Sequence, residues 1–382
     1  MKEPFGRLPH GPLYAAGALS LAYLLLVRFL PFPEPALRTE MAEASRLMAA
    51  AGAAIKDCRE SRNVKVDRET DPNGTGLIGL ETSAITTSAG RLEAKRTTTN
   101  PNFAGLVVSL LYEAGIRRGD AVAVGASSSF PALIIATLSA AKVMGLETLV
   151  ISSLGSSEWG ANIPEFNWTD MEDCLRDAGV LDVRPIAWAV GGDEDVGRDM
   201  DPTGRTLLES GIRESGVPFL EESDLERNVA SRMKLYLERA GTKPIKTFVN
   251  IGGSWANIGT NAEVLKLRPG LTADVFIPPP AERGVLQAMA ARHVPVIHLL
   301  NVKGLCERYG LPWDPRPLLR PDDGPLFRRA VAGSWPSAAL GVAYILAMII
   351  IIFLMRRRFP EWSCAVKPPA ADAARGSDGG HA

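Results

Sequence analysis

The stretch AVAVGASSSFPALIIATLSAAKVMGLETLVIS, residues 121–152, decides the fold. It contains two short apolar runs, 121–125 and 148–152, and between them a Ser-rich turn and an expected helix over 131–144. The runs are unbroken rather than alternating, which is typical of strands buried on both faces of a sheet. A strand, a helix and a second strand in this order predict two parallel strands joined by a right-handed crossover.

The same alternation continues towards both ends of the chain. A helix is expected over 102–115, before the first strand, and further strands and helices follow the second. The expected strands are 184–191, 246–253, 274–278 and 294–300, and the expected helices are 170–178, 206–215, 224–240 and 282–292. Helices that separate buried strands favour an α/β class with a Rossmann-like, doubly wound and mostly parallel sheet.

Two apolar stretches predict transmembrane helices on either side of this domain. Residues 334–355 carry no charge, with Trp335 at one border and three arginines at 356–358 beyond the other. Residues 13–30 carry one charge, Arg28. About 20 apolar residues cross a bilayer as a helix. For 13–30 a signal peptide cleaved near Ala36 is the alternative, but the stretch is longer than a typical signal core, so we favour an uncleaved anchor.

These stretches divide the chain into six segments. We expect a cytoplasmic N-terminus, a first span, a helix that acts as a stalk or packs on the domain, the α/β domain, a second span and a disordered cytoplasmic tail; their ranges are 1–12, 13–30, 36–65, 66–330, 334–355 and 356–382. The arginines at 356–358, with Lys2 and Arg7, place both termini in the cytoplasm. The domain is then extracytoplasmic at a cell membrane, although Arg316 and Arg320 oppose that bias.

Composition narrows the classes of function. The net charge of −1 provides no basic stripe for nucleic acid. Cys58, Cys174 and Cys306 are isolated, so neither a zinc knuckle nor a disulfide framework can be read from them. The acidic stretch 191–201 lacks the spacing of an EF-hand and is interpreted as a solvated loop. No phosphate-binding or dinucleotide motif is present, so we expect no cofactor and no metal.

Three polar loops directly follow predicted strands and are the candidate binding site. The carboxyl ends of parallel strands share one edge of a sheet, where ligands bind between diverging loops. The alternative is that the serines of the first loop only cap the following helix. The candidate ligand-binding residues are Gly125, Ser127, Ser128 and Ser129 in the first loop, Ser153, Ser156, Ser157, Trp159 and Asn162 in the second, and Gly252, Gly253, Ser254 and Asn257 in the third.

A catalytic alternative uses the first loop as a nucleophile elbow. Ser127, Asp193 and His298 occur in the chain order of an α/β-hydrolase triad. Two features oppose it: Ser129 stands where the elbow pattern has a second glycine, and His298 lies inside an apolar strand, where a lone histidine is usually a packed core residue. Whether the chain is an enzyme stays open.

The segments 97–171 and 249–260 carry a resemblance to a known family. The first includes GASSSFP and SSLGSSEWGAN, and the second reads VNIGGSWANIGT. With these loops the chain resembles the poly-gamma-glutamate system proteins. The resemblance implies a bacterial envelope protein that works with the machinery for making or exporting poly-gamma-glutamate, an anionic capsule or released exopolymer. It assigns no catalytic residues.

We therefore expect an accessory component of poly-gamma-glutamate biosynthesis and export. Its partners are the polymer or its precursor, other membrane subunits of the complex and the membrane itself. An extracytoplasmic serine-dependent hydrolase or transferase that acts on the amide chain of the polymer is the alternative. A plain scaffold, whose spans hold the complex together, is the third hypothesis.

Overall fold

The computed structural model describes residues 10–29, 37–182, 184–328 and 335–358. The chain divides into two compact units, one spanning Pro35–Arg328 and the other combining Met1–Glu34 with Arg329–Ala382. The expected N-terminal segment before residue 10 and the expected tail after residue 358 lie outside the described residues.

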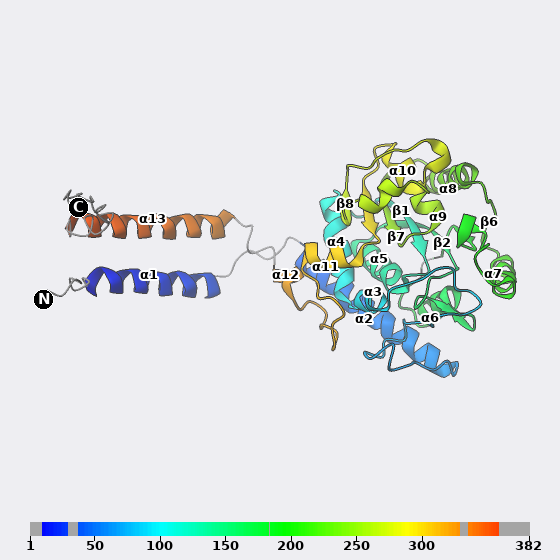
Figure 1. Cartoon of the computed structure of the whole chain (residues 1–382), viewed down its shortest axis with the longest axis horizontal. Helices are drawn as coiled ribbons and strands as arrows, with labels where there is room; N and C mark the ends of the chain where they lie inside the picture. The colour runs from blue at the N-terminus through cyan, green and yellow to red at the C-terminus, as the bar shows by residue number, and fades with distance from the viewer. Residues whose placement is uncertain (1–9, 30–36, 183, 329–334, 359–382) are drawn as a thin grey trace, which may run out of the picture. The chain divides into compact units, whose positions relative to one another are not determined.

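A seven-stranded sheet forms the centre of the larger unit, with helices around it (Figure 1). The strand order is β6-β5-β2-β1-β7-β9-β8, and the order reverses between β1 and β7. All neighbouring pairs are parallel except β8 and β9. The predicted mixed α/β class with a mostly parallel sheet is confirmed. The strands are β1 Ala121–Ser127, β2 Glu147–Ser153, β5 Ala187–Ala189, β6 Phe219–Leu220, β7 Ile245–Ile251, β8 Gly270–Thr272 and β9 Val296–Leu299.

One predicted strand is wrong. Residues 274–278 form no strand, and the antiparallel edge strand β8 lies just before them at Gly270–Thr272. Phe276 is 56% exposed, so this apolar run is not buried in the sheet. Pro278 ends the run and two more prolines, at 279 and 280, follow it, and proline cannot donate the hydrogen bonds that a strand needs.

Helices cover both faces of the sheet. On one face Val122 and Val124 of β1 share a core cluster with residues of α2, α4 and α5. On the other, Ala123 and Phe248 share a cluster with residues of α8 and α10. The helices of this unit are α2 Arg38–Ser61, α3 Leu92–Thr98, α4 Asn102–Glu113, α5 Pro131–Met144, α6 Trp168–Asp177, α7 Pro202–Ser215, α8 Leu225–Ala240, α9 Trp255–Ile258, α10 Val285–Ala290, α11 Val302–Tyr309 and α12 Pro325–Arg328.

The unit from β1 to β2 follows the local chemistry of the sequence. All seven residues of β1 are buried, as expected of a central strand. Pro131 occupies the first turn of α5, where its fixed φ suits a helix and its missing N–H has no partner to lose. Gly145 ends the helix with φ 65°, a left-handed conformation that glycine adopts without steric cost. Each predicted element of this stretch is therefore present.

Helix α2 is a core helix of the domain. Ala44, Ala51 and Ile55 are fully buried and belong to the same cluster as α4 and α5. Of the two roles expected for residues 36–65, the structure shows packing on the domain rather than a free stalk.

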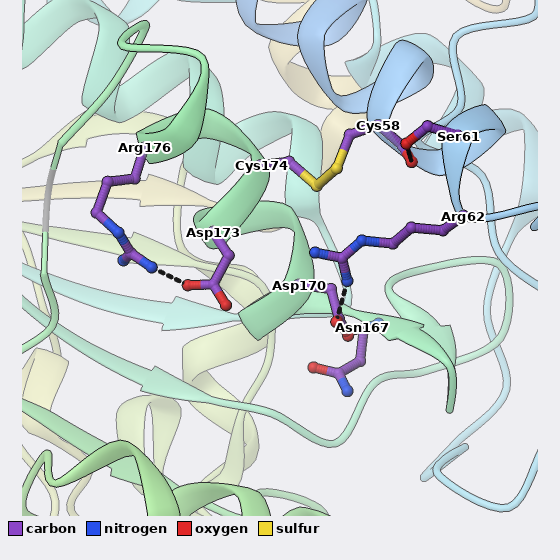
Figure 2. Close-up of a disulfide and its surroundings, with 8 residues drawn as sticks. All are labelled: Cys58, Ser61, Arg62, Asn167, Asp170, Asp173, Cys174 and Arg176. Atoms are coloured by element: carbon purple, nitrogen blue, oxygen red, sulfur yellow. Dashed lines mark hydrogen bonds and ion pairs between the residues drawn. A yellow bond between two sulfur atoms is a disulfide. The ribbon is translucent and has the colours of Figure 1, made fainter.

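A disulfide joins α2 to α6 (Figure 2). Cys58 and Cys174 are 116 residues apart in sequence, with their Cα atoms separated by 6.0 Å. The sequence offered no spacing from which this pair could be read. Beside the disulfide, Arg62 from the end of α2 forms an ion pair with Asp170 of α6. The third described cysteine, Cys306, is a buried free thiol.

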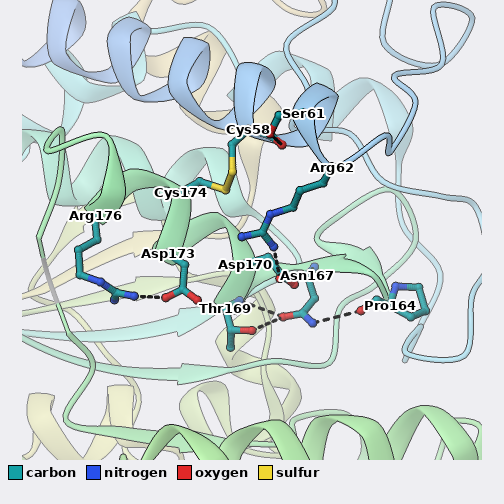
Figure 3. A network of polar contacts seen from close by, with 10 residues as sticks. All are labelled: Cys58, Ser61, Arg62, Pro164, Asn167, Thr169, Asp170, Asp173, Cys174 and Arg176. Atoms are coloured by element: carbon teal, nitrogen blue, oxygen red, sulfur yellow. Dashed lines mark hydrogen bonds and ion pairs between the residues drawn. A yellow bond between two sulfur atoms is a disulfide. The ribbon is translucent and has the colours of Figure 1, made fainter.

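The first turn of α6 is capped close to the disulfide (Figure 3). Asn167 accepts a hydrogen bond from the backbone N–H of Thr169 at 2.9 Å, and Asp170 accepts one from the N–H of Asn167 at 3.0 Å. This reciprocal arrangement satisfies N–H groups that a helix start would otherwise leave unpaired. The disulfide, the cap and the Arg62–Asp170 pair therefore hold the same corner of the domain.

The smaller unit contains two apolar helices, α1 His10–Phe29 and α13 Trp335–Arg358. Ala338–Met355 in α13 is long and apolar enough to cross a membrane by length and composition. Among the described residues no second helix meets this test, because the apolar part of α1, Leu13–Phe29, is shorter. Residues 13–29 of the expected span 13–30 are thus helical but do not form a second transmembrane candidate, and residue 30 lies outside the described residues. The two helices pack together through stacked rings of Tyr23 and Tyr344, with centroids 4.5 Å apart.

Candidate functional site

A cleft of about 570 Å³ lies at the carboxyl edge of the sheet. Residues at or just after the ends of β1, β2, β5, β7 and β9 line it: Ser127, Ser153, Gly192, Gly253 and Leu300. The predicted convergence of the strand-following loops is therefore seen, with the loop after β9 as an additional wall. In an open sheet whose strand order reverses, this is where ligands bind.

The two serine-rich loops are interlocked by hydrogen bonds. Ser127 Oγ donates to Ser129 Oγ at 3.0 Å, and Ser129 Oγ also accepts the backbone N–H of Ser157 at 2.9 Å. These three serines line the cleft. Ser128 and Ser156 are fully buried: Ser128 Oγ donates to the carbonyl of Ser153 at 2.7 Å, and Ser156 Oγ donates within its own loop. Three of these five serines therefore line the cleft, and Ser129, together with the two buried serines, holds the loops in place.

Lys95 of α3 is the residue that sequence reasoning missed. Its side chain lines the cleft although the residue is only 3% exposed. Nζ donates to the carbonyl of Ser129 and lies 2.7 Å from Ser157 Oγ and 3.9 Å from the centroid of the Phe130 ring. No carboxylate in the described ranges lies within ion-pair distance of it. In sequence it is one lysine on a short helix, indistinguishable from a solvated one.

Burial lowers the pKa of Lys95 to about 7, because the charged amine loses its hydration, and nearby Glu158 opposes this shift. The amine is therefore partly neutral at physiological pH. Its two polar contacts, a carbonyl and a hydroxyl, carry no formal charge. A neutral amine beside a hydroxyl in a cleft is a base within reach of a nucleophile.

The third loop is divided between the cleft and the interior. Gly253 and Ser254 line the cleft. Gly252, with φ 78°, lies against Ser127, because a Cβ added there would be 3.0 Å from Ser127 Cβ. The end of β1 and the loop after β7 are therefore in close contact.

Gly125 and Asn257 belong to the interior. Asn257 of α9 is fully buried, and a Cβ on Gly125 would lie 2.7 Å from both atoms of its amide. Neither amide atom of Asn257 has a hydrogen-bond partner among the described residues. Gly125 is thus required for close packing, and the structure does not place either residue on the cleft.

Trp159 and Asn162, two predicted ligand-binding residues, also lie away from the cleft lining. Asn162 is fully buried, and its amide bonds both the N–H and the carbonyl of Leu80 at 2.8 Å. Trp159 donates its backbone N–H to the same carbonyl at 2.7 Å. These two residues anchor the segment around Leu80.

The predicted triad is not assembled. His298 on β9 is 2% exposed, and its Nδ1 lies 3.1 Å from Asn250 Nδ2. Burial lowers the pKa of His298 to about 4. No hydrogen bond within the described part of the chain joins Ser127, Asp193 and His298. Ser127 and Asp193 both line the cleft, whereas His298 does not. The apolar strand around His298 was the signal that it is a packed residue.

Charged residues of both signs are part of the cleft lining. Arg91 and Lys303 are exposed cations, and neither has an ion-pair partner among the residues that the structure describes. Asp193 and Asp199 lie in the loop after β5. Residues of both signs therefore reach the cleft.

The loop after β5 is not a purely solvated acidic loop. Asp195 is 1% exposed and pairs with the fully buried Arg232 of α8, with Oδ2 2.5 Å from Nη2. Asp195 also accepts the hydroxyl of Ser153 at 3.2 Å. Within the described ranges no group of three or more His, Cys, Asp or Glu side chains is placed to hold a metal ion. Asp195 thus anchors the loop after β5 to α8.

Comparison of the chain with known protein families, curated proteins and solved structures found no match.

Proposed function

We propose that this protein is a membrane-anchored accessory component of poly-gamma-glutamate biosynthesis and export, and that its α/β domain binds polymer or precursor in the cleft. The assignment to poly-gamma-glutamate rests on the resemblance of the serine-rich loops to the poly-gamma-glutamate system proteins. The observation that carries the binding role is a cleft at the carboxyl edge of the sheet that combines hydroxyl groups with the exposed cations Arg91 and Lys303.

The chemistry of the cleft suits a chain of γ-linked glutamates. Each unit of such a chain carries one carboxylate and one amide. Guanidinium and ammonium groups bind carboxylates, and hydroxyl groups exchange hydrogen bonds with amides. Because Arg91 and Lys303 have no competing ion-pair partner in the described ranges, their charges are available to a ligand.

The proposed location rests on two further features. The disulfide between Cys58 and Cys174 favours an oxidising compartment, since cytosolic thiols are normally kept reduced. The α13 helix is followed by arginines at 356–358, which favour a cytoplasmic C-terminus. The domain then lies outside the cytoplasm, where an exported polymer passes. We also propose that α1 lies beside α13 at the membrane, and that the domain is a Rossmann-like, doubly wound fold.

Binding of a γ-linked glutamate oligomer to the full-length protein in detergent tests the ligand. Charge reversal by Arg91→Glu or Lys303→Glu is expected to weaken binding by at least about tenfold at low salt, because a like charge repels the carboxylates. Lys234→Glu is the matched control, since Lys234 is an exposed lysine of α8 outside the cleft lining. Equal weakening by all three variants would show non-specific attraction instead.

Deletion of the gene tests the role in the system. We expect the amount, size or location of the polymer to change, and restoration by the intact gene but not by a Lys303→Glu copy. Polymer that is unaltered in all three respects would sink the proposal.

A further inference from the structure

The hydroxyl of Ser157 lies in an arrangement that its loop does not need. Ser157 Oγ is 2.7 Å from Lys95 Nζ, and both side chains line the cleft. Within the described ranges, Lys95 is the only hydrogen-bond partner of the Ser157 hydroxyl. The Ser157 backbone N–H already bonds Ser129 Oγ, so the loop is held without the Ser157 hydroxyl.

Lys95 is equally hard to explain as a packing residue. Burying an amine without a counter-charge is costly, and a methionine would fill similar space without that cost. The carbonyl of Ser129 takes one N–H of Lys95. In the neutral amine the lone pair is then free to accept the Ser157 hydroxyl proton. Desolvation, which lowers the pKa of Lys95 to about 7, makes that form available at neutral pH.

We propose that Ser157 and Lys95 are a nucleophile and its general base, and that the cleft transfers acyl groups from amides or esters through a covalent acyl-serine. Serine–lysine pairs are a known variant of the serine–histidine arrangement, recognised by geometry rather than by sequence position. The inference goes beyond the proposed function because it does not depend on which acyl compound the cleft binds.

With an amide as the substrate, the reaction begins at the Ser157 hydroxyl. The neutral Lys95 amine takes the proton of the Ser157 hydroxyl, and Oγ forms a bond to the carbonyl carbon. The carbon–nitrogen bond breaks as the Lys95 ammonium gives its proton to the leaving nitrogen. Water or an amine acceptor then attacks the acyl-serine, Lys95 takes a proton from the attacking group, and that proton returns to Ser157 Oγ as the ester bond breaks.

The assignment differs from the triad in a way that can be measured. The triad uses Ser127 with His298, whereas the geometry here uses Ser157, which follows the neighbouring strand. A reagent that phosphonylates activated serines, such as a fluorophosphonate, forms a bond to the nucleophile with loss of fluoride. Peptide mass mapping of the adduct then identifies the serine directly.

The experiment treats the full-length protein in detergent with a fluorophosphonate at several pH values. We expect an adduct on Ser157, at a rate that rises with pH with a midpoint near 7, because only the neutral amine accepts the proton. An adduct on Ser127, or no adduct at any pH, overturns the proposal. This readout on the unmodified protein does not depend on any variant folding.

Variants separate the two roles. Ser157→Ala is expected to abolish the adduct, and Lys95→Met to slow its formation by at least about 100-fold, as loss of a general base does. Lys95→Arg should be as slow, because arginine stays protonated. Ser109→Ala in α4 and Lys234→Met in α8 are matched controls away from the cleft, expected to label normally. Unchanged labelling of Lys95→Met overturns Lys95 as the base.

Failure of this inference is distinguishable from failure of the proposed function. Binding of the γ-linked glutamate oligomer is measured on the same Ser157→Ala preparation, where it should persist. Binding without an adduct on the unmodified protein sinks only the acyl transfer. An adduct without binding sinks only the polymer ligand.

Discussion

Lys95 and His298 are two buried bases near the same edge of the sheet, with different surroundings. They are 3% and 2% exposed, and burial lowers the pKa of both, to about 7 and about 4. Lys95 lies beside a hydroxyl on the cleft, whereas His298 lies beside the amide of Asn250 and away from the cleft lining. Burial and a lowered pKa therefore do not mark a reactive base. A reactive base is instead marked by its hydrogen-bond partner and by its position in the cleft lining.

A similar contrast separates the polar residues of the cleft from those of the interior. In the cleft, Ser127, Ser129 and Ser157 belong to the lining. In the interior, Asp195, Arg232 and Asn257 are buried and do not line the cleft. We therefore expect substitutions in the interior set to cost stability, and substitutions in the cleft set to cost function at nearly unchanged stability.

The largest loss of stability is expected for Asp195→Ala. It leaves the guanidinium of Arg232 buried without its carboxylate, which lowers the free energy of unfolding by about 3–5 kcal/mol. Urea unfolding measures this. Glu194→Ala is the control, because its pair with Arg198 is solvent-accessible and is worth about 0–1 kcal/mol. Equal losses of unfolding free energy in the two variants would show that the buried pair is worth no more than the surface pair.

Removal of the disulfide ranks next. Replacing Cys58 and Cys174 by serine frees a loop of 116 residues, and we expect a loss of about 2–4 kcal/mol. Thermal unfolding with and without reductant provides the measurement. The Cys58–Cys174 corner is outside the cleft lining, so fluorophosphonate labelling of the folded variant should match that of the unmodified protein. A lost adduct would mean that this corner supports the cleft.

Two glycines, Gly125 in the interior and Gly253 in the cleft lining, test the same contrast between interior and cleft. Gly125→Ala brings a Cβ to 2.7 Å from the Asn257 amide and the Phe248 ring, and should cost about 1–3 kcal/mol. Gly253→Ala on the cleft meets its nearest atom at 3.4 Å and should change stability by less than about 0.5 kcal/mol. Denaturant midpoints of both variants decide this, and a more harmful Gly253→Ala would reverse the assignment.

The two bases themselves should make stability depend on pH, with a slope of at most about 1.4 kcal/mol per pH unit for each. The folded-state pKa of each lies below its ordinary value, so between the two values the unfolded chain binds more protons and stability rises with pH. For His298 this window is roughly pH 4 to 6.5, and for Lys95 it is roughly pH 7 to 10.5. We expect His298→Gln to flatten only the first window and Lys95→Met only the second. Free energies of unfolding measured across this pH range check this, and a variant that flattened the other window would contradict the assignment.

The fold could largely be predicted because its strongest signals are local. The run from Ala121 to Ser153 contains buried strands, a proline at a helix start and a glycine at its end, and each acts within a few residues. The apolar run at 274–278 misled because an unbroken run shows hydrophobicity but not burial. Prolines on its C-terminal side were the available warning.

The sequence predicted the location of the site at the carboxyl edge of the sheet, but not the side chains that line it. The positions of Ser127, Ser153 and Gly253 follow from the rule that loops after parallel strands converge. The orientation of each side chain does not follow, which is why Asn162 was placed in the cleft and Lys95 was not. The Cys58–Cys174 pair and the Lys95–Ser157 contact join segments 116 and 62 residues apart, and no local pattern encodes them.

The central claim is that Lys95, and not His298, is the base of the cleft, and direct titration of Lys95 tests it. The full-length protein carrying ¹³C-labelled lysine is followed by NMR across pH, with Lys95→Met to assign the signal. We predict a midpoint near pH 7 for Lys95, well below the ordinary pKa of a lysine side chain. A Lys95 midpoint near pH 10, the ordinary range of a lysine side chain, would contradict the claim.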